Sequence, residues 1–142
     1  GNWGIGNSGN LRFGRKVYHC WKKGGHGPTS ITKAVRESCN VYFQRASMRM
    51  DIDTIAKYAN IFGLGKRTGI SLPREVSGLI PTKAWKKKRL GQEWQPGETL
   101  SCAIGQSYVL TSSIQLAQSY GAIANGGRIY RPYVVKDIYT PK

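Results

Sequence analysis

The sequence predicts an α+β fold that is mainly helical and has short edge strands. Apolar residues recur at three- and four-residue spacing in several segments, and residues that can cap a helix precede these segments. Glycines stand where the periodic segments stop. Short β-branched and aromatic runs follow near the C-terminal end. With 142 residues, of which 39% are hydrophobic, the chain can bury a modest core.

The first part of the chain predicts two helices. Residues 1–14 are rich in glycine and predict turns and an irregular hairpin that stays outside the core. Thr29 or Ser30 can then cap a helix that reaches Ser38. The next helix covers roughly residues 40–50, and its apolar side chains face more than one direction, which predicts burial on more than one side.

The middle of the chain predicts one more helix and a long irregular stretch. Asp53 is placed to be the N-cap of a helix that Gly63 ends. Residues 64–100 show no sustained helical period and predict loops.

The most regular helical period lies near the C-terminal end. Thr111 or Ser112 can cap a helix that stops at the glycine pair 126–127. Residues 128–130 and 133–135 then predict short strands. The proline between them favours an edge position, because proline donates no hydrogen bond to a neighbouring strand.

The formal net charge is +15, and residues 85–89 (WKKKR) form a basic run beside an aromatic residue. Such runs are found in nucleic-acid-binding proteins. No helix-turn-helix, zinc-finger or RNA-binding signature accompanies the run, and most charge runs are solvated faces, so nucleic acid is the least favoured partner. Anionic lipid headgroups or wall polymers would attract the same charge. The sequence contains no run of 18 or more apolar residues and therefore predicts no membrane-spanning helix.

The motif with the greatest chemical interest is Ser38-Cys39-Asn40, which lies between the first two predicted helices. In isolation it carries little information, since Ser38 could merely end one helix and Asn40 could cap the next. Its neighbours change that assessment: residues 21–27 (WKKGGHG) precede it and residues 41–44 (VYFQ) follow it. Further along the chain come 103–106 (AIGQ) and 124–127 (ANGG).

In this order and spacing, the segments resemble the transpeptidase domain of class B penicillin-binding proteins, above all the elongation type (penicillin-binding protein 2). The likeness includes residues 62–65 (FGLG), 68–75 (TGISLPRE) and 78–81 (GLIP). The lysine-rich run 85–89 and residues 94–97 (WQPG) favour the elongation type over the septal one. The resemblance implies the helical portion of the penicillin-binding/β-lactamase-like transpeptidase fold, which lies beside a five-stranded sheet.

Enzymes of this family need three motifs: Ser-x-x-Lys with the nucleophile, Ser-x-Asn or Ser-x-Asp, and Lys-Thr-Gly or a variant. Only the middle one is present. Residues 30–33 (SITK) match the first literally, but they stand only eight residues before Ser38, whereas the family's nucleophile lies well upstream. Residues 66–69 (KRTG) contain an interrupting arginine and come at the wrong place in the order. Residues 1–142 are therefore expected to be the central part of one transpeptidase domain.

The resemblance also implies roles for individual residues. Ser38 would relay a proton between the upstream lysine and the departing amide nitrogen. Asn40 would donate its amide to the carbonyl on the acyl side of the substrate and accept from the catalytic lysine. Gly105 and Gln106 would support the cleft, although relatives usually have a second glycine where this chain has Ser107.

The activity implied by the resemblance is that of a peptidoglycan D,D-transpeptidase, which cross-links wall peptides by serine acyl transfer during cell elongation. The expected partners are stem peptides ending in D-Ala-D-Ala, β-lactams and membrane proteins of the elongation complex, but not nucleic acid. The expected location is the periplasmic face of the bacterial inner membrane, with the anchor outside this sequence. The alternatives are a zinc-stabilised binding module without catalysis and, less favoured, a basic nucleic-acid-binding protein.

Cys20, His26 and Cys39 form a second candidate site, because thiolate and imidazole are preferred zinc ligands. Their spacing matches no standard zinc finger. The resemblance supports the assignment: some elongation-type relatives carry zinc near the Ser-x-Asn motif, and the first of its four ligands would lie just before Gly1. A structural zinc ion is therefore expected in the intact protein.

Other roles for these residues remain open. Cys39 could be a small buried residue, His26 could close a turn, or Cys20 and Cys39 could form a disulfide. Cys102 is expected in the core. His19 is expected to be exposed and is a poor fourth ligand, because adjacent residues in an extended segment point apart.

The missing motifs lead to a first prediction. The 142-residue chain should not be labelled covalently by a fluorescent penicillin, because it contains neither the Ser-x-x-Lys nucleophile nor the Lys-Thr-Gly strand. The measurement is in-gel fluorescence after incubation, with mass spectrometry for adducts. Stoichiometric acylation of any serine in this chain would contradict the motif assignment.

Overall fold

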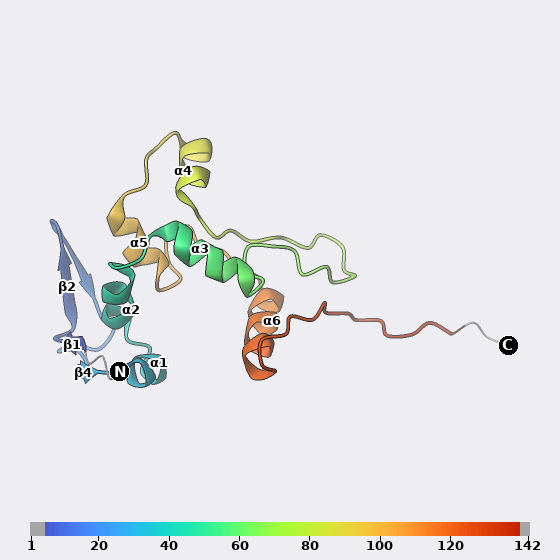
Figure 1. Cartoon of the computed structure of the whole chain (residues 1–142), viewed down its shortest axis with the longest axis horizontal. Coiled ribbons are helices and arrows are strands. Elements are labelled where there is room, and N and C mark those ends of the chain that lie inside the picture. The colour runs from blue at the N-terminus through green and yellow to red at the C-terminus, as the bar shows by residue number, and fades with distance from the viewer. Residues whose placement is uncertain (1–4, 140–142) are drawn as a thin grey trace. The chain divides into compact units, whose positions relative to one another are not determined.

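The computed structural model describes residues 5–139, which form helices and a few short strands (Figure 1). In chain order the elements are β1 (Ile5–Asn7), β2 (Asn10–Phe13), β3 (Lys16–His19), β4 (Gly27–Thr29), α1 (Ile31–Arg36), α2 (Asn40–Ser47), α3 (Ile52–Ile61), α4 (Lys83–Leu90), α5 (Pro96–Cys102) and α6 (Ser113–Ala124). The predicted mainly helical α+β character is confirmed. Within the described range, no helix is long and apolar enough to cross a bilayer.

The described residues form two compact units, one from residues 5–52 and 83–107, the other from 53–82 and 108–139. In the first unit, β2 pairs with β3 and β1 pairs with β4, both antiparallel. Helix α2 packs against α1, α5 and strands β1, β2 and β3 (Figure 1). This unit therefore surrounds the helix that begins at Asn40.

The core of the first unit gathers around the Ser38-Cys39-Asn40 turn. Its buried members come from strands, helices and connections: Leu11, Tyr18, Cys20, Ala34, Cys39, Val41, Tyr42 and Leu100. The Tyr18 hydroxyl also donates to the carbonyl oxygen of Gly97, at 2.8 Å. The prediction that residues 1–14 stay outside the core was wrong, because β1 and β2 bring Asn7 and Leu11 into it.

Two glycines of the N-terminal segment, Gly9 and Gly25, are required by the backbone geometry there. Gly9 and Gly25 both have positive φ, at 88° and 76°. A side chain at Gly25 would collide with the backbone of Asn7 and of Gly9. Glycine is therefore required where the segment after Asn7 crosses the loop before His26.

The helix ends agree with the sequence signals at two places and differ at others. The Ser30 hydroxyl accepts from the Lys33 backbone N–H and caps α1, and Ser112 caps α6 in a capping box with Gln115. Helix α2 ends at Ser47, three residues short of the predicted end at residue 50. Helix α3 begins at Ile52, so Asp53 lies in the first turn and is not the N-cap.

The predicted loop-rich stretch between residues 64 and 100 has no helix over residues 64–82 or 91–95, but it contains α4 and most of α5, which the prediction missed. Helix α5 begins at Pro96, and Glu98 forms a capping box with Gln95. The buried Lys86 ammonium of α4 lies 2.7 Å from the Glu98 carboxylate. The buried position of α4 is thus filled by a lysine and the helix has few apolar residues, so its sequence shows little of the apolar periodicity that predicts a helix.

The second unit is organised around the buried side chain of Gln115 on α6. Its amide nitrogen donates to the backbone carbonyl oxygens of Lys66 and Ser77, at 2.5 and 2.7 Å. One helix residue thereby holds two parts of the preceding loop. The Glu75 carboxylate closes this loop by accepting from the Thr68 hydroxyl and from the backbone N–H of Thr68 and Gly69.

The predicted strands at residues 128–130 and 133–135 are wrong within the described part of the chain. These residues are extended or irregular and pair with no other described segment. Large side chains there are exposed: Ile129, Tyr130, Tyr133, Val134 and Val135. A strand needs a partner for its backbone hydrogen bonds, and a sequence run cannot supply it.

The Glu75 contacts lead to a second prediction, that Glu75→Gln lowers the Tm of the chain at neutral pH. The hydrogen bond from the Thr68 hydroxyl lowers the pKa of Glu75, and burial opposes this effect. Together with the hydrogen bonds from the Thr68 and Gly69 backbone, it holds this pKa below its ordinary value of 4.5. Because the folded pKa is depressed, this stabilisation is present above pH 4.5 and is lost as pH falls through the folded pKa.

The measurement is thermal unfolding of both proteins between neutral and acidic pH. The Tm difference should shrink as pH falls. Glu93→Gln is the matched control, because Glu93 forms an exposed pair with Lys87 that should contribute little. Equal Tm values for wild type and Glu75→Gln at neutral pH would show that the carboxylate does not hold the loop.

Candidate functional site

The Ser38-Cys39-Asn40 turn connects α1 to α2 with alternating side-chain exposure. Ser38 is exposed, Cys39 is fully buried and Asn40 is half-buried. Ser38 has a φ of 48°, the left-handed conformation that reverses the chain after α1. The two polar residues are therefore accessible, while the residue between them anchors the turn in the core.

Neighbouring groups fix the backbone of this turn. The Trp21 indole N–H donates to the carbonyl oxygens of Glu37 and Ser38, at 3.0 and 3.2 Å. The Cys39 backbone N–H donates to the Ala34 carbonyl oxygen at 2.9 Å. The turn is thus held by one aromatic side chain and by the end of α1.

The side chains of Ser38 and Asn40 remain available. Among residues 5–139, neither side chain takes part in a hydrogen bond with another residue. Cys39 is the N-cap of α2 and Asn40 is its first residue, so the alternative that Asn40 caps this helix was wrong. Serine can accept and donate a proton, and a carboxamide can donate and accept hydrogen bonds. The pair can therefore orient a substrate amide.

The literal Ser-x-x-Lys match at residues 30–33 has structural roles only. The Ser30 hydroxyl caps α1, as described above. The Lys33 ammonium donates to the carbonyl oxygens of His26 and Pro28, at 2.7 and 3.3 Å. These contacts agree with the rejection of Ser30 as a nucleophile.

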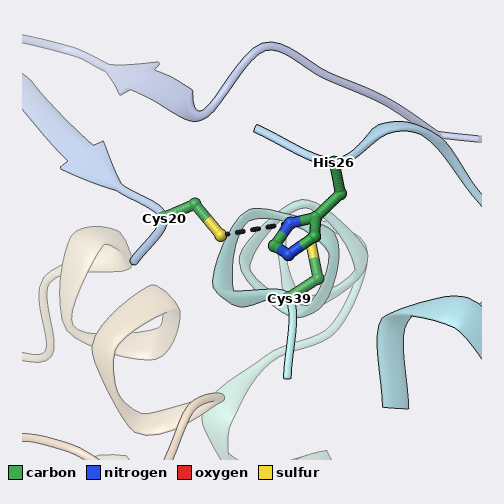
Figure 2. Close-up of side chains that lie close together, drawn as sticks. All are labelled: Cys20, His26 and Cys39. Carbon is green, nitrogen blue, oxygen red and sulfur yellow. Dashed lines mark hydrogen bonds between the residues drawn. The ribbon is translucent and has the colours of Figure 1, made fainter. Parts of the chain in front are cut away.

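Cys20, His26 and Cys39 converge behind the turn (Figure 2). Their potential ligand atoms all lie within 4.8 Å of one another, and the Cys20 Sγ lies 3.5 Å from the His26 Nδ1. Cys20 follows β3, His26 precedes β4, and Cys39 ends the connection between α1 and α2. Strand pairing and helix packing bring together three residues that are separate in the sequence.

Asn7 is a fourth member of this cluster that sequence reasoning missed. Its Nδ2 donates to Cys39 Sγ at 2.8 Å and lies 3.3 Å from His26 Nδ1. Its register partner across the β1–β4 pair is Gly27, directly after His26. The sequence prediction of turns over residues 1–14 contained no such pairing, so it gave no reason to place Asn7 beside His26. A ligand before Gly1 lies outside the described residues and stays a prediction.

The two thiols have different electrostatic environments. Burial opposes ionisation of Cys20, but backbone N–H groups of Lys22, Val41 and Asn40 lower its pKa below the ordinary value. Burial raises the pKa of Cys39, and the charge on Cys20 raises it further. Of the two thiols, Cys20 therefore ionises more readily than Cys39.

This donor set fits a soft divalent metal, since zinc prefers thiolate sulfur and imidazole nitrogen. Cys20 and Cys39 are free cysteines, not the alternative disulfide. His19 is exposed and its Nδ1 lies 2.7 Å from the Asn10 Oδ1, which confirms that it is not part of the cluster. Cys102 is buried, as predicted.

Gly105 and Gln106 lie in the turn after α5 and are exposed. No hydrogen bond joins them to Ser38 or Asn40 among the described residues, so their supporting role stays a prediction. Gly105 has a φ of 74° and Ser107 a φ of 65°. Ser107 occupies a left-handed conformation that glycine adopts more easily, at the position where relatives usually have glycine.

The basic run at residues 85–89 is partly paired with carboxylates. Lys86 is buried against Glu98, and the Lys87 ammonium lies 2.7 Å from the Glu93 carboxylate. Lys83, on the same helix, pairs with Asp51 at 3.0 Å. Carboxylates therefore pair with three lysines of α4, whereas Lys88 and Arg89 are exposed.

Residues 7–142 match the penicillin binding protein transpeptidase domain, and the chain belongs to that family. Among curated relatives, it is 37% identical to the peptidoglycan D,D-transpeptidase MrdA of Haemophilus influenzae over 87% of the chain and 19% of the relative. It is 36% identical to MrdA of Escherichia coli K12 over 84% and 19%. The chain thus spans about a fifth of their length.

Solved structures show the same likeness. The complex of the penicillin-binding protein PBP2 with MreC from Helicobacter pylori matches with a TM-score of 0.92 and 35% identity, over 99% of this chain and 26% of that one. Pseudomonas aeruginosa PBP2 in complex with WCK 5153 matches with a TM-score of 0.86 and 33% identity, over 91% and 30%. The chain therefore has the fold of one part of these transpeptidase domains.

Proposed function

We propose that this chain is the central part of a peptidoglycan D,D-transpeptidase that cross-links wall peptides by serine acyl transfer during cell elongation. The observation that carries the proposal is the turn in which Ser38 and Asn40 are accessible on either side of the buried Cys39. Relatives of 37% and 36% identity are peptidoglycan D,D-transpeptidases by name. The substrate class is a stem peptide ending in D-Ala-D-Ala.

Acyl transfer needs a nucleophile, a proton path to the leaving amine and fixed donors for the substrate. In this proposal, the Ser38 hydroxyl passes a proton from the catalytic lysine to the leaving nitrogen. The Asn40 amide donates to the substrate carbonyl and accepts from the same lysine. The nucleophilic serine and this lysine belong to the Ser-x-x-Lys motif, which this sequence does not contain.

The proposed partners follow from the same family. β-Lactams would acylate the intact enzyme as substrate mimics, and membrane proteins of the elongation complex would bind it. The structural relatives include a PBP2 complex with MreC and a peptidoglycan synthase complex. The proposed location is the periplasmic face of the bacterial inner membrane, because peptidoglycan is assembled outside that membrane.

We also propose a structural zinc ion held by Cys20, His26 and Cys39. Two sulfurs and one imidazole nitrogen supply three of the four ligands of a tetrahedral site. Asn7 lies beside these three residues with its NH₂ toward them, so the fourth ligand would be a water or the residue expected before Gly1. Such an ion would brace the turn from behind. The same cluster supports the alternative of a zinc-stabilised module without catalysis.

The third prediction tests Ser38. In the intact protein, Ser38→Ala should slow acylation by a fluorescent penicillin by about 10²–10⁴-fold, the cost of losing a proton-transfer group. The fold should persist, since the Ser38 hydroxyl makes no hydrogen bond with a described residue. Stopped-flow or gel-based acylation rates and circular dichroism provide the two measurements.

Ser107→Gly is the matched control, because it replaces an exposed serine in a left-handed conformation by a residue that tolerates it. It should acylate at the normal rate. Normal acylation by a folded Ser38→Ala protein would reduce Ser38 to a helix terminator and support the alternative without catalysis.

The fourth prediction tests the metal. Cys39→Ser should abolish stoichiometric zinc binding in the intact protein, purified without chelators. It should also lower the Tm by about 5–10 °C, the effect expected for losing a metal whose concentration is well above its Kd. Acylation should weaken as well, because the turn loses its anchor. Elemental analysis and thermal unfolding provide the readouts.

His19→Ala is the control for this experiment, because His19 is exposed and directly precedes Cys20. It should retain zinc. A wild-type protein without zinc above the buffer blank would refute the zinc proposal and leave the proposed transpeptidase activity intact.

A further inference from the structure

The two ring nitrogens of His26 face different groups. Nδ1 points into the cluster, 3.3 Å from the Asn7 Nδ2 and 3.5 Å from the Cys20 Sγ. Nε2 points the other way, 3.6 Å from the Glu37 Oε2. The His26 side chain is fully buried, and Nε2 has no hydrogen-bond partner at this separation.

The position of the proton on this ring follows from Asn7. The Asn7 Oδ1 accepts from the Gly9 backbone N–H at 2.8 Å, which fixes the orientation of the amide and turns its NH₂ toward the cluster. An amide NH₂ group only donates, so the Asn7 contact is a hydrogen bond only when His26 Nδ1 accepts. A neutral imidazole that accepts at Nδ1 has its proton on Nε2.

The Nε2–H group then requires an acceptor, since a buried donor without one costs the full desolvation penalty. Glu37 is the carboxylate that faces it. The oxygen that faces His26 is Oε2, whereas the exposed Arg36 Nη2 donates to the other oxygen, Oε1, at 3.2 Å. A small side-chain rotation brings Oε2 and Nε2 into hydrogen-bond range.

We infer that Glu37 is a positioning residue for His26: it accepts from Nε2–H and holds the ring with its Nδ1 lone pair toward Cys20 and Cys39. This inference deepens the proposed zinc site, because histidines that bind a metal usually donate their other N–H to a carboxylate or carbonyl. Glu37 directly precedes Ser38, and its carbonyl oxygen accepts from Trp21. The same residue thus connects the cluster to the turn.

The test compares Glu37→Ala and Glu37→Gln with Arg36→Ala. Gln keeps an acceptor oxygen at the same place. Arg36 is exposed and contacts only the other carboxylate oxygen, so its loss is the matched control. Long-range ¹⁵N–¹H NMR of the metal-free chain at about pH 8, where an ordinary imidazole is neutral, reports which nitrogen has the proton.

Wild type and Arg36→Ala should show His26 protonated at Nε2 alone. Glu37→Ala should show a mixture of the two tautomers, and Glu37→Gln should restore the wild-type signal in large part. The only other histidine, His19, pairs with Asn10 and should not change in any variant, so it serves as the internal reference.

Zinc affinity, measured by competition with a chromogenic chelator, gives a second readout. Glu37→Ala should weaken zinc binding by about 10–100-fold, and Arg36→Ala should leave it unchanged. A proton on Nδ1 of His26 in wild type would overturn the inference, as would wild-type tautomer and affinity in Glu37→Ala. If the His26 tautomer depends on Glu37 but the protein does not bind zinc, the inference about Glu37 stands and only the zinc proposal is refuted.

Discussion

The complete burial of Cys39 is the constraint on which the candidate active site depends. Its sulfur lies among Asn7, Cys20 and His26, so the side chains on either side of it are directed outward. The left-handed backbone of Ser38 is tolerated because this anchor and the end of α1 determine it from both sides. The accessibility of Ser38 and Asn40 is thus a consequence of what the residue between them does.

The composition of the cluster has an electrostatic consequence. Two thiolates would balance a zinc dication without further charge, and both His26 and Asn7 are neutral donors. A buried site with no net charge has a smaller desolvation cost than one with a carboxylate added. Asn7 also fits the metal-free cluster, where its NH₂ donates to Cys39 Sγ, because an ionised carboxylate has no hydrogen to donate there.

Sequence signals predicted the elements whose stability is local. Helices α1 and α6 have capping hydroxyls at Ser30 and Ser112, and α6 also has a long apolar period. Helices α4 and α5 were missed because the pairing of Lys86 with Glu98, which stabilises them, joins two polar residues that give no apolar period. The runs at 128–130 and 133–135 have strand-like composition, but pairing is non-local and a composition cannot provide it.

The same division applies to the site. The tripeptide and the three metal-ligand candidates were recognisable from residue type and from the family's motif order. Asn7 could not be recognised in this way, because only the β1–β4 pairing places it beside Cys39. Glu37 could not be recognised either, because its proposed role depends on the direction in which the His26 ring points. Cys39 is fully buried, Glu37 is half-buried with one oxygen facing His26, and Ser38 is exposed. The site proposed here therefore uses four consecutive residues, from Glu37 to Asn40, of which the Ser-x-Asn motif names two.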